Sequence, residues 1–110
     1  MAPEDTLSFD IEKSTDTSQN QVTAVKFHGK LVSTTVPQMR DFVKPLIPIG
    51  GRIILDMADL SFLDSSGLGA LVSLKASALR QGYCTLELAN MTPRILDLLR
   101  VSKLTQVFSS

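Results

Sequence analysis

Residues 52–69 read Arg-Ile-Ile-Leu-Asp-Met-Ala-Asp-Leu-Ser-Phe-Leu-Asp-Ser-Ser-Gly-Leu-Gly, and this stretch decides the fold class. Its first part holds three consecutive large apolar residues, Ile53, Ile54 and Leu55, which follow a turn rich in proline and glycine. A short apolar run of this kind predicts a strand over residues 52–57 that is buried on both faces. The residues that follow, 58–64, predict a loop.

A helix is expected after this loop, because apolar residues recur there at helical spacing. These residues are Leu68, Leu71, Val72 and Leu79. Ser65 or Ser66 is placed to cap the N-terminus of the helix. Gly82 is placed to end it, since glycine readily adopts the left-handed conformation of a helix C-terminus. The stretch therefore predicts the strand–helix unit of an α/β fold.

The preceding part of the chain predicts an antiparallel hairpin. Apolar residues alternate with polar ones from Leu7 onward, which is the period of a half-buried strand. Residues 14–21 are polar and predict a loop. Residues 22–31 resume the strand pattern, with Val25 and Phe27 on one face and Lys26 and His28 on the other.

The remaining segments predict crossover helices and one more parallel strand. A helix begins after the candidate caps at residues 33–35 and ends or kinks near Val43–Lys44, because Pro45 removes a backbone donor. Residues 83–88 alternate like a strand, with Cys84 facing inward as a buried, inert thiol. Thr92 and Pro93 start a last helix, which ends near Val101, with Ile95, Leu96, Leu98 and Leu99 as its apolar face. Leu104, Val107 and Phe108 form a terminal apolar cluster and a candidate edge strand.

Length and composition set the broad class. The chain has 110 residues, which corresponds to one domain, and we expect a short flexible tail over residues 1–6 and a domain over residues 7–110. Eleven basic and eleven acidic residues cancel, which argues against nucleic-acid binding through a basic face. No apolar run reaches the length of a membrane span, and the first residues lack a signal-peptide pattern. We therefore expect a cytoplasmic protein without membrane insertion.

The sequence lacks the motifs of several enzyme classes. A phosphate-binding P-loop is absent, and neither Ser65 nor Ser66 stands in a Gly-x-Ser-x-Gly nucleophile motif. The only histidine, His28, is expected on an exposed strand face, where it would be no general base. One cysteine and one histidine exclude a zinc site of these ligands, and we expect no metal, no cofactor and no catalysis. A receiver domain is disfavoured, because Glu12 and Lys13 end the first strand where that domain has an acidic pair.

Residues 59–69 are the candidate functional segment. They join the most apolar strand to the best-formed helix, and ligands of such sheets meet the loops beyond the strand ends. A helix start also offers free backbone donors that favour an anion such as phosphate. A purely structural role is the alternative: a serine caps the helix, Asp64 shapes the turn, and Gly67 and Gly69 allow the helix to approach the sheet closely.

This segment closely resembles the signature loop of the STAS domain, as found in bacterial anti-sigma factor antagonists. The resemblance extends over nearly the whole chain, and Gly29-Lys30-Leu31 and Ile53-Ile54-Leu55-Asp56 agree with other family motifs. It implies one α/β domain: a mixed β-sheet with an N-terminal antiparallel hairpin and crossover helices packed on the sheet.

The resemblance also implies a function without catalysis. Family members bind an anti-sigma factor that is a serine kinase and thereby release a sigma factor. The kinase phosphorylates the serine after the signature aspartate, which corresponds to Ser65, with the neighbouring Ser66 as second choice, and a serine phosphatase reverses the modification. The implied partner-binding loop consists of Asp59, Asp64, Ser65, Ser66, Gly67 and Leu68. We expect a monomer.

Two positions depart from the family pattern. Lys30 stands where the family usually has Glu, and Val32 stands where the turn usually ends in an acidic residue. Such a change alters the partner surface and leaves Ser65 untouched. A second function is therefore kept: a STAS module in another assembly, such as the accessory subunit of a lipid-transport ATPase or a stress-signalling scaffold.

Overall fold

The structure, a computed structural model, describes residues 6–82 and 84–103, and over these residues it contains one mixed four-stranded sheet. The strands are β1 (Leu7–Thr15), β2 (Gln21–Leu31), β3 (Gly51–Leu63) and β4 (Cys84–Ala89), in the order β1-β2-β3-β4. β1 and β2 form the predicted antiparallel hairpin, and β2, β3 and β4 are parallel. The fold class is confirmed. Most of the tail and the terminal cluster of Leu104, Val107 and Phe108 lie outside the described residues.

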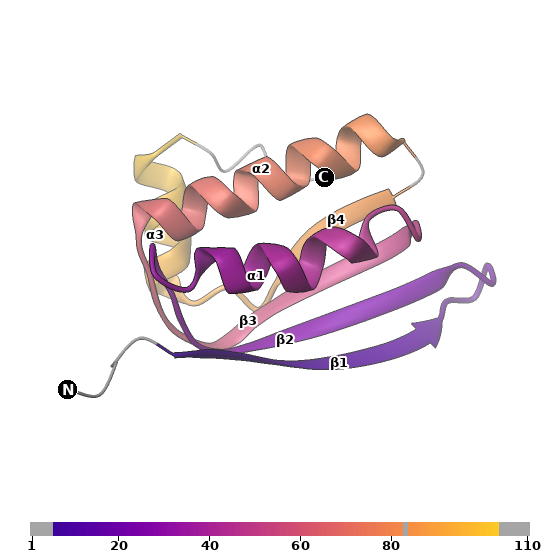
Figure 1. Ribbon diagram of the computed structural model, residues 1–110, viewed down its shortest axis with the longest axis horizontal. Coiled ribbons are helices and arrows are strands. Elements are labelled where there is room, and N and C mark those ends of the chain that lie inside the picture. The colour runs from indigo at the N-terminus through magenta and orange to yellow at the C-terminus, as the bar shows by residue number, and fades with distance from the viewer. Residues whose placement is uncertain (1–5, 83, 104–110) are drawn as a thin grey trace.

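The helices are α1 (Val36–Val43), a 3-10 turn η1 (Lys44–Leu46), α2 (Ser65–Gln81) and α3 (Pro93–Val101). α1 connects β2 to β3 and α2 connects β3 to β4, and both lie over the same face of the sheet (Figure 1). This follows from the strand order, because right-handed crossovers that proceed in one direction place consecutive helices on one side. No helix of the described residues lies on the other face of β1, β2 and β3 (Figure 1).

The prediction that β3 is buried on both faces is wrong. Ile53, Leu55 and Met57 are buried beneath the helices, whereas Arg52 is exposed and Ile54 is only half-buried. The reason is that both crossovers cover the same face. The apolar run of residues 53–55 therefore contributes alternate side chains to the core, and the other face of the strand meets solvent.

The loop predicted over residues 58–64 is also wrong, because β3 continues as far as Leu63. Its second half pairs with the end of β2, where His28 lies opposite Asp59 and Leu31 lies opposite Leu63. The register shifts between Lys26 and His28 and again between Gly29 and Lys30. Such bulges interrupt the period of two, which explains why the sequence pattern gives no strand signal here.

The helix ends are largely as predicted. α1 ends at Val43 and continues into η1, which contains Pro45. Gly82 ends α2 in the left-handed conformation with φ of 86°, and the side chain of Thr92 caps α3. Thr35, one of the candidate caps, is the N-cap residue of α1, but its side chain makes no cap hydrogen bond. Its hydroxyl instead bonds the backbone of Val32 and Lys30.

Two predicted core positions are exposed. Leu79 shares a stripe of α2 with Leu68, three turns earlier, yet it is 67% exposed whereas Leu68 is buried. The stripe is covered at the N-terminal end of α2, where the core includes Ile95 and Leu99 of α3. At the other end α2 is still packed, because Ala78 is buried, but Leu79 lies on the flank of the buried face. Leu96 of α3 is likewise exposed, whereas Leu71 and Cys84 are buried as predicted.

Candidate functional site

The β3–α2 junction is built around Asp64. Asp64 has extended backbone geometry and is the N-cap of α2, and its Oδ1 accepts a hydrogen bond of 2.8 Å from the Gly67 amide. The expectation that Ser65 or Ser66 caps the helix is wrong, because both serines lie inside the first turn. A carboxylate at this position also offsets the partial positive charge of the helix N-terminus.

Asp64 also connects the helix start to the β2–α1 loop. Its Oδ2 accepts a bond of 3.2 Å from the Ser33 amide, and its own amide donates to the carbonyl oxygen of Leu31 at 3.3 Å. One side chain thereby orients two segments that are 31 positions apart. Sequence analysis missed the role of Ser33, because a backbone amide leaves no residue-type signal.

The two glycines of the segment have different roles. A Cβ on Gly67 would lie 2.4 Å from the carbonyl oxygen of Leu31 and 2.8 Å from Cδ1 of Leu63. Gly67 therefore allows α2 to approach the end of β2, as predicted. A Cβ on Gly69 would meet nothing within 4 Å, so the same expectation for Gly69 is wrong. Gly67 and Leu68 are buried and shape the junction from within.

The junction leaves two hydroxyl groups accessible. Ser65 and Ser66 are the first two residues of α2, and both are exposed, next to the half-buried Asp64. The third exposed polar residue of the expected loop, Asp59, does not join them. It lies in β3, and its side chain bonds His28 on the sheet face that the helices leave uncovered.

His28 lies between two carboxylates that belong to neighbouring strands. Its Nδ1 is 2.5 Å from Oδ2 of Asp59, and its Nε2 is 2.7 Å from Oδ2 of Asp10. These hydrogen bonds, the one to Asp59 being the stronger cause, raise the pKa of His28 above its ordinary value of 6.5. Both ring nitrogens are occupied, which is poor geometry for a general base acting on a serine. The cluster instead ties β1, β2 and β3 together.

A shallow hollow opens beside the junction. Its lining residues are Lys30, Val32, Ser33, Ser61, Phe62 and Asp64. Phe62 is 42% exposed, and a large aromatic side chain at the surface is a typical anchor for a protein partner. Phe62 is not among the residues predicted for the site, because the sequence pattern predicts a loop over residues 58–64. Of the two positions that depart from the family pattern, Val32 is buried and Lys30 is half-buried.

The described residues contain neither a metal-binding cluster nor a membrane-spanning helix. Within residues 6–82 and 84–103, no three His, Cys, Asp or Glu side chains are grouped so that they could hold a metal ion. The thiol of Cys84 is buried, and burial raises its pKa. None of the helices in the described part of the chain is long and apolar enough to cross a membrane.

Comparison with known proteins agrees with the fold. The family model of the STAS domain matches residues 13–110. An anti-sigma-B factor antagonist of Staphylococcus aureus is 32% identical over 89 residues, which cover 80% of this chain and 82% of that protein.

Two solved structures of SpoIIAA are similar to this chain. The unphosphorylated form of this anti-sigma factor antagonist superposes with a TM-score of 0.70 at 26% identity, covering 90% of this chain and 84% of the other. The phosphorylated form of this Bacillus cell fate determinant gives a TM-score of 0.65 at 26% identity, covering 90% and 86%. Together with the family match over residues 13–110, these likenesses establish that the chain belongs to the STAS domain family.

Proposed function

We propose that this protein is an anti-sigma factor antagonist. It binds an anti-sigma factor that is also a serine kinase and thereby frees a sigma factor for transcription. It acts by binding, without catalysis, as a monomer in the cytoplasm, where transcription takes place. The relative from Staphylococcus aureus carries the name anti-sigma-B factor antagonist, and SpoIIAA carries the same general description.

The proposed switch is phosphorylation of Ser65, with Ser66 as the second candidate. The observation that carries it is the position of Ser65, which is exposed and directly follows the N-cap Asp64 as the first residue of α2. A kinase can phosphorylate only a hydroxyl that reaches its active site, so the acceptor serine has to be accessible without unfolding of the core. SpoIIAA has been solved in phosphorylated and unphosphorylated forms, which supports a switch of this kind in the family.

Phosphorylation of Ser65 is expected to weaken partner binding and to leave the fold intact. A phosphate adds about −1.5 to −2 charges near neutral pH. At a helix N-terminus that charge is favoured by about 0.3–1 kcal/mol for an exposed group, so the fold persists. A partner surface that is complementary to a neutral hydroxyl is then opposed by the size and the negative charge of the phosphate. The carboxylate of Asp64 adds to this negative charge. A loss of about 2.8 kcal/mol weakens binding about a hundredfold. A serine phosphatase restores the binding form.

The partner surface extends from the serines to the neighbouring hollow. Phe62 supplies an exposed aromatic anchor there, and Lys30, Ser33 and Asp64 supply polar contacts around it. Because Lys30 is basic, a partner that places an acidic group at this hollow is favoured. Asp59 contributes through the outer face of the sheet, next to His28.

The direct test uses the cognate anti-sigma factor, copurified from the native cell with the wild-type protein. The protein is incubated with this kinase and ATP, the phosphate is located by mass spectrometry, and affinity is measured before and after. We expect phosphate on Ser65 and about a hundredfold weaker binding. Ser65→Ala is expected to bind permanently, and Ser65→Glu is expected to bind weakly. Ser66→Ala is the matched control and is expected to remain switchable.

Three outcomes would contradict the proposal. A phosphate placed elsewhere would move the switch, and full modification of Ser65 with unchanged affinity would remove it. Copurification of a transport ATPase or a large signalling assembly, without a kinase, would favour the second function, a STAS module in another assembly. Hydrolysis of esters or nucleotides that persists in Ser65→Ala and is lost in His28→Ala would show that the protein is an enzyme.

A further inference from the structure

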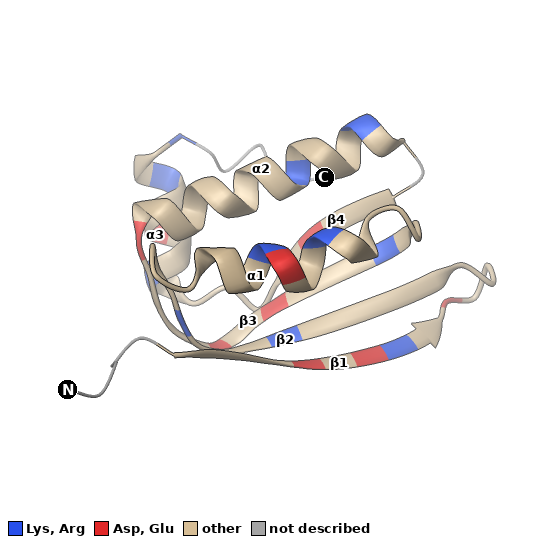
Figure 2. Ribbon diagram, viewed as in Figure 1, with Lys and Arg blue, Asp and Glu red and all other residues tan. Residues whose placement is uncertain are grey.

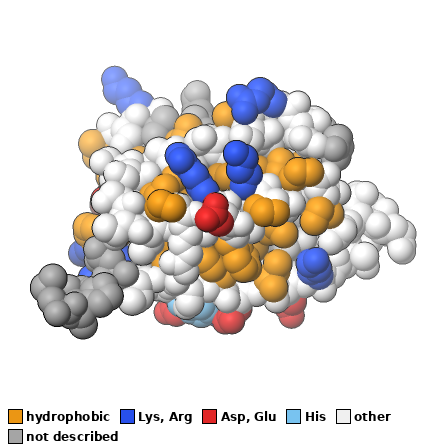
Figure 3. Space-filling view, in the orientation of Figure 1, with side chains coloured by type: hydrophobic (Ala, Val, Ile, Leu, Met, Phe, Trp, Pro, Cys, Tyr) orange, Lys and Arg blue, Asp and Glu red, His pale blue; other side chains and the backbone are white. Residues whose placement is uncertain are grey.

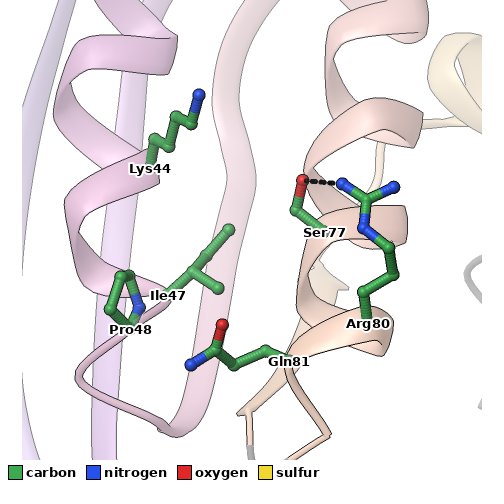
Figure 4. Close-up of a pocket in the computed structure, with 6 residues that line it drawn as sticks. All are labelled: Lys44, Ile47, Pro48, Ser77, Arg80 and Gln81. Carbon is green, nitrogen blue, oxygen red and sulfur yellow. Dashed lines mark hydrogen bonds between the residues drawn. The ribbon is translucent and has the colours of Figure 1, made fainter.

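A groove lies between the C-terminal ends of the two helices that cover the sheet. Six residues line it: Lys44, Ile47, Pro48, Ser77, Arg80 and Gln81. The first three follow α1, and the others belong to the last turns of α2, so the two walls come from different helices (Figure 4). Its volume of about 240 Å³ is suited to a few side chains. The groove plays no part in the proposed function.

The groove is basic and has an apolar floor. Within the described part of the chain, neither Lys44 nor Arg80 has an acidic partner, and none of the lining residues is acidic. Among the described residues, the side chain of Arg80 donates one hydrogen bond, of 3.4 Å, to the hydroxyl of Ser77. Ile47 is buried at the base of the groove, with Pro48 beside it and the exposed Ile49 following in the chain. Two cations beside an apolar surface favour a ligand with carboxylates and an apolar side chain.

The charge of the whole molecule reinforces this preference. The formal net charge is zero, yet α1, η1 and α2 carry more basic than acidic residues, whereas both signs occur on the strands (Figures 2 and 3). On α1, η1 and α2 the only acidic residue is Asp41, against the basic residues Arg40, Lys44, Lys75 and Arg80. The uncovered sheet face carries a surplus of acidic side chains: Asp10, Glu12, Asp56, Asp59 and Glu87, against Lys26, Arg52 and His28. The groove therefore lies in the positive half of the molecule, which attracts anionic partners.

We propose that this groove is a second docking site, which binds an acidic peptide segment of a partner protein. Carboxylates of the segment pair with Lys44 and Arg80, and an apolar side chain packs on Ile47 and Pro48. Arg40 lies one turn before Lys44 on the same side of α1 and extends the basic surface. α2 has 17 residues, so its two ends are about 24 Å apart. The groove and the Ser65 junction can therefore be occupied at the same time.

The test uses a displayed library of random peptides, selected against the folded wild-type protein at low salt. Selected peptides are synthesised with a fluorescent label, and Kd is measured by anisotropy. We expect peptides rich in Asp and Glu with at least one large apolar residue. Lys44→Glu and Arg80→Glu are each expected to raise Kd about tenfold, because each reverses a charge in direct contact with the peptide. Added salt is expected to weaken binding.

Matched controls separate the groove from the general charge of the protein. Lys26→Glu makes the same charge change on the uncovered sheet face, and its Kd is expected to stay unchanged. Ile49→Ser removes the exposed apolar side chain that directly follows the lining residue Pro48 in the chain, and it is expected to weaken binding. Leu79→Ser is the control for this change. It removes an exposed apolar side chain of α2 that points away from the groove, since residue 79 is about 200° around the helix from Ser77. Circular dichroism and melting confirm that each variant is folded.

The proposal is overturned by any of four results. These are the selection of no peptide, the selection of peptides without an acidic excess, binding that is insensitive to both charge reversals in the groove, and an equal loss in Lys26→Glu. The result is independent of the Ser65 switch, because the measurement requires neither a kinase nor phosphate. Chemical-shift changes at Ser77 and Gln81 on peptide addition would locate the complex directly.

Discussion

Replacing Gly67 with alanine tests how α2 is held against the end of β2. The added Cβ would lie 2.4 Å from a backbone oxygen, that of Leu31, which cannot move aside as a flexible side chain can. Overpacking of this kind costs about 1–3 kcal/mol. The amide of residue 67 also donates to Asp64, so a shift of the helix weakens the N-cap. For a domain of this size, each kcal/mol lowers the melting temperature by about 4 °C.

Gly69→Ala is the matched control in the same helix and the same motif. Its Cβ would meet no atom within 4 Å, and alanine is preferred to glycine inside a helix by about 0.5–1 kcal/mol. Thermal and urea unfolding, followed by circular dichroism, are therefore expected to show Gly69→Ala as stabilised and Gly67→Ala as destabilised. The reasoning is refuted if Gly67→Ala is as stable as the wild type, or if both variants lose stability equally.

Three further predictions concern the cap, the core and the pH dependence. Asp64→Ala is expected to lose about 1 kcal/mol of unfolding free energy in urea, whereas Asp64→Asn keeps the cap and loses less; equal losses would contradict the capping role. Leu71→Ala is expected to cost about 2–5 kcal/mol, because Leu71 is fully buried, whereas exposed Leu79→Ala should stay within about 0.5 kcal/mol; similar melting temperatures would place α2 in another register. The bond to Asp59 raises the pKa of His28 in the folded state, so its stabilisation is complete below pH 6.5 and is lost as the pH rises through the folded-state pKa. His28→Gln should remove this part of the pH profile, and an unchanged profile would show that another group is responsible.

The order of strands and helices could be predicted from the sequence, because its signals are local. Alternation along residues 22–31 identifies β2 and its buried face with Val25 and Phe27. Gly82 and Thr92 mark helix ends through their own backbone and side-chain preferences, whatever surrounds them. The placement of Ser65 at a helix start was equally accessible, since the helical period begins directly after it.

Apolar periodicity predicted the elements better than it predicted which of their apolar residues are buried. Leu79 and Leu68 have nearly the same place in the helical pattern, yet Leu68 is buried and Leu79 is exposed, so what packs against that side of the helix differs between its two ends. Ile54 belongs to an apolar run, but no described helix covers its face of β3, because both crossover helices pack on the other side. Burial of this kind depends on which elements meet, and periodicity within one element does not report it.

The details of the junction were decided by tertiary structure alone. Asp64 caps α2 in place of a serine because its second oxygen also reaches the Ser33 amide, 31 positions away. His28 finds Asp59 at the same separation, through the pairing of β2 with the second half of β3. The sequence determined the elements, since period and capping act over a few residues. Contacts across 31 positions exist only when the strands have paired, and they determine which carboxylate caps, which glycine is required and where the exposed serines lie.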